Sequence, residues 1–512
     1  MPVLCHHGAR SAQYVAILQG QAHEAVYNVA GGTDTCPPLP DFPPKDLPMP
    51  RHHLPHPPRL TRSPQGRRPA RLLALGLALA AALPGLAQAQ GVQELYDAAR
   101  AYDAPYQSAR AQAEAAEFKA EQSRALNRPL VNAIGTLSES RADTPYTSTI
   151  STRSGVQSLG VTAQQSLFNR GNDKTISQAE RAIEVARSQL LAAEQDLIVR
   201  VVQAYFDVLS AADALETVRT SKKATAEQLA SAKRNFEVGT ATITDTREAQ
   251  ARFDLGTAQE LAAENDLNVK RLALASVVGR AGAVPKPLAV PVVLPAVVPA
   301  DMEQWVTQAD AASPVLAQLR LAREVARLET EKARTGHLPT VGVSASFTES
   351  HSRISGETRA GAFGPSSGTG PQGTVALQLN MPIFSGFSVQ NRIKETLSLE
   401  DKAQSDLEAA RRNTAQATRS AFFTVQSLRG QVLALEAAES SSKLALEATQ
   451  LGYKVGVRVN LDVLNAQTQL YQAQRDLAKA RYDVIFNGVR LRQVSGQLQP
   501  QDVALVEALL AR

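Results

Sequence analysis

NFEVGTATITDTREAQ, which is residues Asn235–Gln250, returns in altered form 217 positions later as GYKVGVRVNLDVLNAQ, residues Gly452–Gln467. The offset carries Gly239 onto Gly456, and each copy places an aspartate six residues after its glycine. A glycine between two helix-forming runs is typical of a chain reversal, because glycine adopts positive φ without a side-chain clash. The echo therefore predicts two equivalent helical hairpins, one in each half of the chain.

The runs that flank these turns are long. The expected helices cover residues 172–234, 244–278, 391–451 and 461–494. In the first of them Ile176, Ile183, Leu190 and Leu197 lie seven residues apart, the spacing of helices that supercoil around one another. About 63 residues at 1.5 Å each give a rod of about 95 Å, which is too long for one compact core. The pattern therefore predicts coiled coils.

Short alternating segments precede each hairpin. An earlier helix is expected over residues 92–127, and strands over 127–140 and 155–168, with a polar loop between them. The second half repeats this with strands over 336–350 and 374–384, the latter including Met381 and Ile383. GTGPQG at 368–373 matches G-x-G-x-x-G, but a strand-like run follows where a dinucleotide site needs a helix. We therefore expect a flexible loop there.

The N-terminal region predicts export. Three arginines precede the apolar run LLALGLALAAALPGL, and AQA follows as a cleavage site, so residues 67–89 are predicted to be a signal peptide. Residues 1–66 are rich in proline and histidine and are expected to be an over-extended translation start. Three of their histidines, His52, His53 and His56, are not expected to bind metal, since they precede the cleavage site.

Removal of the leader changes the composition. Residues 1–89 hold eight of the 54 basic and four of the 49 acidic residues, which leaves 46 against 45. No basic excess remains to indicate nucleic-acid binding. Both cysteines and six of the eight histidines also precede residue 90, and the rest shows no zinc spacing, Walker loop or nucleophile elbow. We therefore expect no enzyme, cofactor or metal.

The domain organisation follows the repeat. Residues 90–283 are expected to form the first structural repeat and residues 301–512 the second, joined by a Pro/Val-rich linker at 284–300. Each expected strand has about 9–14 residues, enough to cross a bilayer when tilted. Four strands cannot close a barrel in lipid. Either they form a small soluble sheet, or several chains pool them, and three chains would supply twelve. Export and the alternating faces favour pooling.

Several motifs now resemble one family. QAYFDVLSAADAL (203–215), RNFEVGTATITD, GHLPT and GYKVGVRVNLDVLNAQTQLYQAQRDLAKARYD are similar to motifs of the TolC family of outer-membrane efflux and type I secretion channels, at the expected places. The resemblance covers nearly all of residues 91–512 and both repeats. It implies an α+β membrane protein: a homotrimeric 12-stranded β-barrel in the outer membrane of a Gram-negative bacterium, continued by an α-helical coiled-coil barrel across the periplasm.

The resemblance also implies partners and a gate. A periplasmic adaptor and an inner-membrane pump, either an ABC transporter or a proton-driven exporter, would complete an efflux or secretion path. By motif, Asp462 would lie in an acidic constriction ring at the periplasmic end. Links that hold the inner coil closed would come from Asp245, Thr244, Tyr453 and Arg458. The simpler interpretation is that both aspartates are helix N-caps.

The chain departs from the family pattern at two of these positions. Asn465 stands where a second ring aspartate is common, so that three copies would carry a ring charge of about −3 instead of −6 by the charge rule for carboxylates. Gln450 faces Gln228 where a glutamate usually pairs with the glutamine. We therefore expect weaker cation binding and a less firmly held closed state.

Two functions from different classes remain. The first is a passive outer-membrane exit duct, opened at its periplasmic end by movement of the coils. The alternative is a soluble periplasmic coiled-coil adaptor or scaffold with a small sheet at one end. Two hairpins interrupted by two equivalent strand pairs favour the duct, since an adaptor is expected to flank one hairpin with all-β sequence.

Overall fold

The computed structural model of the chain describes residues 89–143, 149–358 and 360–511. The expected over-extended translation start, residues 1–66, lies outside the described residues, as do all but the last residue of the expected signal peptide. The described residues belong to one compact unit in which the same order of elements occurs twice.

The first half contains α3 (Val92–Tyr102), α4 (Ala104–Arg124), the short 3₁₀ helix η1 (Ala125–Asn127), β1 (Leu130–Asp143), β2 (Thr149–Phe168), α5 (Arg170–Glu237) and α6 (Ile243–Val278). The second half contains α7 (Met302–Ala312), α8 (Pro314–Arg334), η2 (Thr335–His337), β3 (Thr340–Thr358), β4 (Gly361–Asn380), α9 (Ser388–Lys454) and α10 (Asn460–Val494), and α11 (Asp502–Glu507) follows. Helix, strand pair and long helical hairpin therefore follow one another in the same order in both halves of the described chain.

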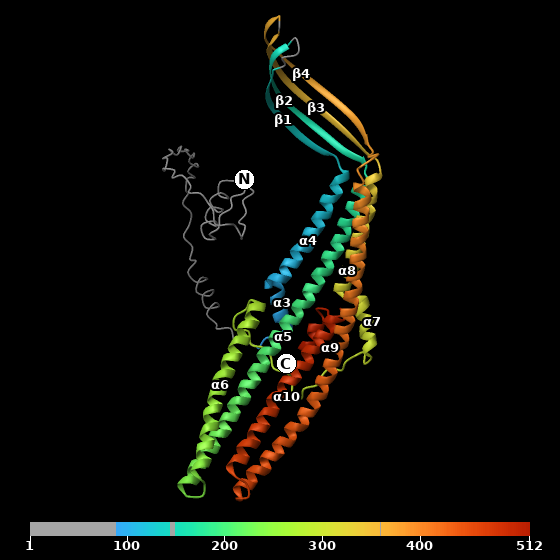
Figure 1. Ribbon diagram of the computed structural model, residues 1–512. Coiled ribbons are helices and arrows are strands. Elements are labelled where there is room, and N and C mark those ends of the chain that lie inside the picture. Colours follow the sequence, from blue (N-terminus) through green and yellow to red (C-terminus); the bar gives the residue numbers. More distant parts are fainter. Residues whose placement is uncertain (1–88, 144–148, 359, 512) are drawn as a thin grey trace, which may run out of the picture. The chain divides into compact units, whose positions relative to one another are not determined.

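The four long helices are confirmed to within a few residues. They form two antiparallel hairpins, α5–α6 and α9–α10, which lie side by side with both turns at the end remote from the strands (Figure 1). Helix α5 begins at residue 170 because Asn169 is its N-cap: the Asn169 side chain accepts hydrogen bonds from the backbone N–H groups of Gly171 and Asn172, at 3.0 and 3.2 Å. Of the heptad residues, Leu197 is fully buried.

The single helix expected over residues 92–127 is wrong in one respect, because the structure divides it into α3 and α4. The break falls at Asp103, whose Oδ1 accepts the Tyr106 backbone N–H at 2.9 Å as the N-cap of α4, with a proline in the first turn. Arg200 of α5 binds the same carboxylate with two hydrogen bonds of 2.7 and 3.0 Å and holds its pKa below the usual value. The second half breaks equivalently between α7 and Pro314 of α8.

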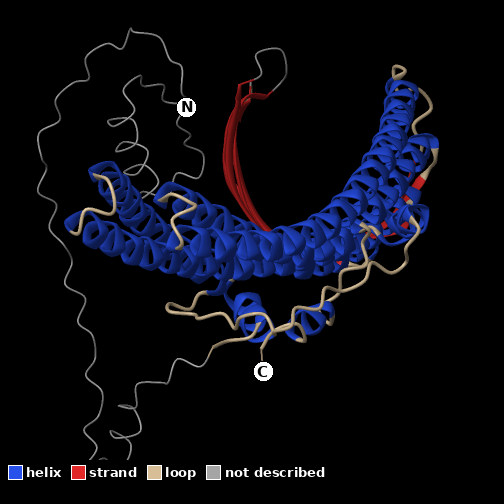
Figure 2. Cartoon of the chain, turned by 90° about the horizontal axis from the view of Figure 1, so that it is seen from below, coloured by secondary structure: helices blue, strands red, loops and turns tan. Residues whose placement is uncertain are grey.

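All four strands form one antiparallel sheet in the order β1-β2-β3-β4. Figure 2 shows them side by side in one curved layer. The central pairing joins the two halves, for example Val161 opposite Phe347 and Ala163 opposite Ala345. Side chains of successive strand residues point to opposite faces of the sheet, and paired residues share a face. The alternating apolar residues that the sequence predicts therefore lie on the same face of neighbouring strands.

The expected strand ends are wrong, because the ladder continues past the apolar alternation. Strands β2 to β4 have 19 or 20 residues each. The expected loop GTGPQG lies inside β4, with Pro371 opposite Glu349, whereas Met381 and Ile383 follow the strand. Pro371 has no backbone N–H to donate, and the ladder continues past it through the backbone groups of its neighbours.

The main apolar core lies midway along the helices. It combines buried side chains from α3, α5, α6, α10 and α11, with Leu288 of the linker region. Tyr205 and Tyr482 both pack against Phe206, with ring centroids 5.6 Å apart in each pair. Tyr482 donates a hydrogen bond of 2.6 Å to Asp213, and burial raises the pKa of that carboxyl. This core fixes α10 against α5 well above the turns.

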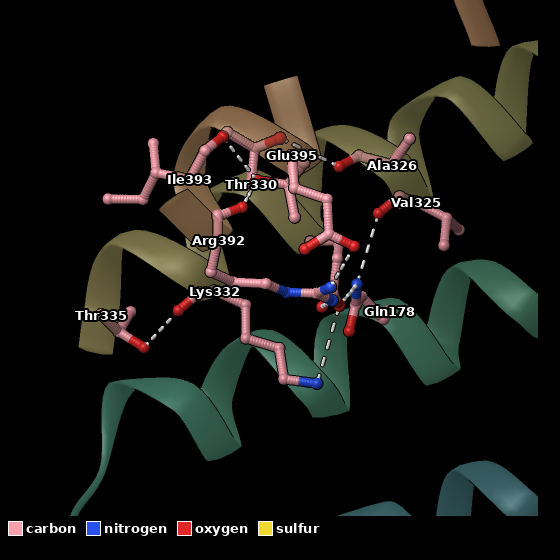
Figure 3. Close-up of polar contacts among 11 residues, drawn as sticks. Gln178, Val325, Ala326, Thr330, Lys332, Thr335, Arg392, Ile393 and Glu395 are labelled. Carbon is pink, nitrogen blue, oxygen red and sulfur yellow. Dashed lines mark hydrogen bonds and ion pairs between the residues drawn. The ribbon is translucent and has the colours of Figure 1, made fainter. Parts of the chain in front are cut away.

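A second junction joins three helices near the strands (Figure 3). Glu329 of α8 accepts hydrogen bonds from Gln178 of α5 at 2.8 Å and from Arg392 of α9 at 2.7 Å. Lys332 lies 3.6 Å from the same carboxylate. These donors hold the pKa of Glu329 below its usual value, with the Gln178 bond the largest cause. One carboxylate therefore connects both halves of the repeat.

Candidate functional site at the helix turns

The two turns have the same backbone geometry. Gly239 and Gly456 both have φ of 78°, as the sequence predicts. The Gly239 N–H donates to the Phe236 carbonyl at 3.0 Å and the Thr240 N–H to the Asn235 carbonyl at 2.8 Å, and the same pattern recurs after α9. This is the Schellman ending, which satisfies carbonyls that a helix end would leave unpaired. An added Cβ meets nothing within 4 Å at either glycine, so only backbone conformation requires them.

Neither aspartate is an N-cap. Thr242 caps α6 and Asp245 is the third helical residue, where its Oδ2 accepts the Thr242 backbone N–H at 3.0 Å and the Thr242 hydroxyl at 2.7 Å. The Thr242 hydroxyl oxygen in turn accepts the Asp245 N–H at 3.2 Å, which completes a capping box. The N-cap interpretation was wrong by three residues because Thr242 takes the cap position.

The start of α10 has no such box. Its N-cap is Val459, which offers no side-chain acceptor, and Asp462 lies in the first helical turn. The Asp462 carboxylate is 3.6 Å from the guanidinium of Arg458. A carboxylate in the first turn is stabilised by the helix dipole, so Asp462 has a structural role in the single chain, and its ring role stays a prediction.

The expected links are rearranged within the chain. The Tyr453 hydroxyl accepts a hydrogen bond of 3.1 Å from Asn235 of α5, which the sequence did not single out. Gln228 donates to Asn460, and the structure does not bring it to Gln450, which is exposed. These contacts join the α5–α6 hairpin to the α9–α10 hairpin.

Two expected residues make no contact between the hairpins. Arg458 pairs within its own segment, and Thr244 is exposed and makes no side-chain hydrogen bond to any described residue. Whether they contact a neighbouring copy stays a prediction. The capping box at the same turn uses Oδ2 of Asp245, and the other carboxylate oxygen accepts no hydrogen bond from a described residue, so the expected link stays a prediction.

Asn465 lies against an arginine. Its Oδ1 accepts a hydrogen bond of 3.1 Å from Nη2 of Arg252, which comes from α6. The expected ring position is therefore occupied by a link between the two hairpins in this chain. An aspartate at this position would form an ion pair with the Arg252 guanidinium, whereas the neutral asparagine forms only a hydrogen bond.

Few apolar side chains are buried at the turn end of the hairpins. Leu464 of α10 packs with Leu229 and Ala232 of α5 and Ala249 of α6. A separate cluster joins α9 and α10 through Leu446, Val463 and Leu470. The first cluster holds one hairpin against the other and has few atoms compared with the core farther up, so the polar links contribute much of the specificity here.

Sequence reasoning missed Asn235, Arg252 and Asn460. A signal existed for Asn460, because Asn460, Leu464 and Gln467 follow the spacing i, i+4, i+7 of one helix face and all three are buried. A polar residue on such a face must find a partner, which the sequence does not identify. Asn235 and Arg252 carry no periodic signal.

Neither metal ligation nor a helical membrane crossing is found in the described part of the chain. No group of three or more His, Cys, Asp or Glu residues among residues 89–143, 149–358 and 360–511 is placed to hold a metal ion. Within the same ranges, none of the helices combines the length and the apolar character that a membrane crossing needs. The three leader histidines lie outside the described residues.

Comparisons with known proteins identify one family for both repeats. The profile of the outer membrane efflux protein family matches residues 95–280 and 305–497, one segment in each repeat. Outer membrane protein TolC of Vibrio cholerae is 32% identical over 85% of this chain and 98% of its own length. Alkaline protease secretion protein AprF of Pseudomonas aeruginosa is 34% identical over 72% of this chain and 74% of its own.

A solved structure shows the same fold. The outer membrane protein VceC of Vibrio cholerae superposes with a TM-score of 0.67 at 18% identity, over 79% of this chain and 96% of that one. The expected fold class, strands for an outer-membrane barrel continued by an α-helical barrel, is confirmed, and the soluble adaptor is not supported. The chain belongs to the outer membrane efflux protein family and is an outer-membrane efflux or secretion channel protein.

Proposed function

We propose that three copies of this chain form one passive exit duct, each contributing four strands to a 12-stranded barrel and two hairpins to a tube across the periplasm. The observation that carries the proposal is the open sheet. Strand β1 pairs only with β2, and β4 pairs only with β3, so both edges lack a partner within the described chain. Unpaired backbone groups are not tolerated in hydrocarbon, and pairing β4 of one copy with β1 of the next closes the wall.

The exposed apolar side chains support this arrangement. Large hydrophobic residues remain exposed on the sheet of the single chain, including Leu137, Leu159, Phe347 and Val375. Strands of this length exceed the hydrocarbon thickness of a bilayer even when tilted, so the ends would extend into water. A lipid-facing outer surface accounts for apolar exposure that a water-soluble sheet would not maintain.

The duct needs partners to move its cargo. No nucleotide-binding motif was found, so energy would come from an inner-membrane pump, either an ABC transporter or a proton-driven exporter. A periplasmic adaptor would join the two. The relatives' names include both efflux and protease secretion, and they support a tripartite efflux or type I secretion system without choosing between them.

The gate of this duct would be its periplasmic end. Asp462 and Asn465 would line the constriction, and the contacts of Tyr453 and Gln228 would hold the hairpins in the closed packing. Three copies of Asp462 would present carboxylates at a narrow mouth, which favours cations over anions. An adaptor that binds the open packing more tightly would shift the population toward it.

Fractionation and electrical recording test the proposal. The mature protein should remain with outer membranes, migrate as a trimer in unboiled gels, and form pores in planar bilayers. A monomer released with the periplasmic contents, which forms no pores after reconstitution, would contradict it.

A further inference from the structure

Asn460 is a buried amide at the first residue of α10. Its side chain is 2% exposed, although the end of a helical hairpin is otherwise mostly solvent-accessible. Oδ1 accepts a hydrogen bond from Nε2 of Gln228 on α5, and Nδ2 donates to the backbone carbonyl of Asp245 on α6 at 3.3 Å. One side chain of the second hairpin therefore contacts both helices of the first.

These two contacts require one relative position of the hairpins. A buried amide costs free energy unless its donor and acceptor are both satisfied. If the α9–α10 hairpin moves away from α5 and α6, both bonds break in the same step, because both partners lie on the first hairpin. An intermediate position would bury the amide with one atom unpaired, so the packing has two favourable states, bonded and separated.

The remaining contacts at this face are weak. Leu464 contributes to a cluster of four buried residues, and Gln467, one turn farther along, has a buried Oε1 without a hydrogen-bond partner among the described residues. An unpaired buried acceptor opposes the packing. The polar bonds of Asn460, together with the Asn235–Tyr453 and Arg252–Asn465 bonds, therefore hold this end of the two hairpins together.

The bonds of Asn460 are also uncharged. Its partners are a carboxamide and a backbone carbonyl, whereas Asp462, two residues later, pairs with Arg458 in the same segment. Salt screens interactions between exposed ions and has little effect on buried neutral hydrogen bonds.

We propose that Asn460 is the positioning residue that holds the α9–α10 hairpin against the α5–α6 hairpin in the closed channel, through neutral bonds that salt does not weaken. The inference rests on the proposed gated duct and adds to it the residue that sets the closed position. Gln228 acts in the same link, as the partner of Asn460.

A double-mutant cycle in planar bilayers tests this link. The mature channel is recorded as wild type, Asn460→Ala, Gln228→Ala and the double variant, and the ratio of open to closed time is measured. We expect Asn460→Ala to raise that ratio at least about a hundredfold, because two neutral hydrogen bonds are lost in each of three symmetric copies. The double variant should open little more than Asn460→Ala, since both substitutions remove the same bond. The increase should be equal at about 0.1 M and 1 M KCl.

Asn487→Ala is the matched control. Asn487 lies on the same helix, but its amide donates only to the carbonyl of Asp483 one turn earlier, at 2.8 Å. This variant should gate as wild type. Before recording, trimer bands in unboiled gels and circular dichroism confirm that each variant is assembled.

The inference would be overturned, and the duct left intact, by assembled Asn460→Ala channels that gate as wild type or by a double variant whose effect is the full sum of the singles. An increase that disappears in 1 M KCl would also overturn it, since the link would then be ionic. Absence of any pore from wild-type trimers is a different failure, because it contradicts the proposed function itself.

Discussion

Replacing Asn465 with aspartate is expected to tighten the closed channel. The change restores the residue that the family pattern favours, and on the ring interpretation alone it would simply add negative charge at the mouth. In this structure the side chain at 465 already accepts a hydrogen bond from Arg252 Nη2 at 3.1 Å. The donor of that bond is already charged, and a carboxylate at 465 would make it an ion pair between two full charges.

The magnitude follows from that change of acceptor. The existing bond already has a charged donor, so the substitution only turns a neutral acceptor into the second charge of an exposed ion pair, and such pairs contribute about 0.2–1 kcal/mol. Because Asn465 is exposed, we take only about 0.7 kcal/mol per chain for the gain. Three symmetric copies give about 2 kcal/mol, which lowers the open-to-closed ratio roughly thirtyfold.

Planar-bilayer recording measures the effect. At about 0.1 M KCl, Asn465→Asp channels should open roughly thirtyfold less often than wild type, and about 1 M KCl should remove most of the difference, because salt screens the exposed pair. Addition of Mg²⁺ should block them only slightly, since Arg252 compensates the new carboxylate. The double variant Arg252→Gln/Asn465→Asp is the control, and it should gate as wild type and gain Mg²⁺ block.

The opposite pattern would refute this reasoning. If Asn465→Asp opened as often as wild type and acquired strong Mg²⁺ block while Arg252 was present, then the ring charge would act independently of the arginine. The contact between α6 and α10 would then have no role in gating.

Three further predictions concern stability, measured by thermal unfolding of the detergent-solubilised channel. Gly239→Ala and Gly456→Ala should each cost about 1 kcal/mol, because alanine resists the φ of 78° although its Cβ has room; unchanged unfolding temperatures would contradict this. Asp213→Asn should stabilise the protein at pH 7 and still offer an oxygen to the Tyr482 hydroxyl. Burial raises the Asp213 pKa, so ionisation of this carboxyl costs the folded protein stability as pH rises through the folded-state pKa, and asparagine avoids that cost. A variant less stable than wild type at pH 7 would contradict this prediction. Glu329→Gln should cost about 1 kcal/mol of stability at pH 7 and less in acid. The Glu329 pKa is lowered in the folded protein, so the ionised carboxylate stabilises the fold, and this contribution is lost as pH falls through the folded-state pKa. A loss of stability that does not depend on pH would show that charge is not the cause.

Periodic features of this protein were predictable from local sequence. Helix ends need glycine at positive φ, and supercoiled helices need an apolar residue every 3.5 positions, so the turns at Gly239 and Gly456 and the long helices were visible in single segments. The break at Asp103 had a local signal in the proline that follows, which the expected continuous helix overlooked. The ends of the strands had none, because ladder hydrogen bonds use backbone groups that every residue except proline carries.

The amino-acid sequence by itself determined the repeat, the helical hairpins, the apolar alternation of the strands and the family. Only the tertiary structure decided which side chains meet at the turns within one chain: Gln228 contacts Asn460, Asn235 contacts Tyr453, and Arg252 contacts Asn465. The physical reason is that periodicity records which face of a helix is buried, whereas a hydrogen bond between helices depends on their axial offset and rotation. Those are set by the packing of the whole bundle, including the core around Phe206 far from the turns.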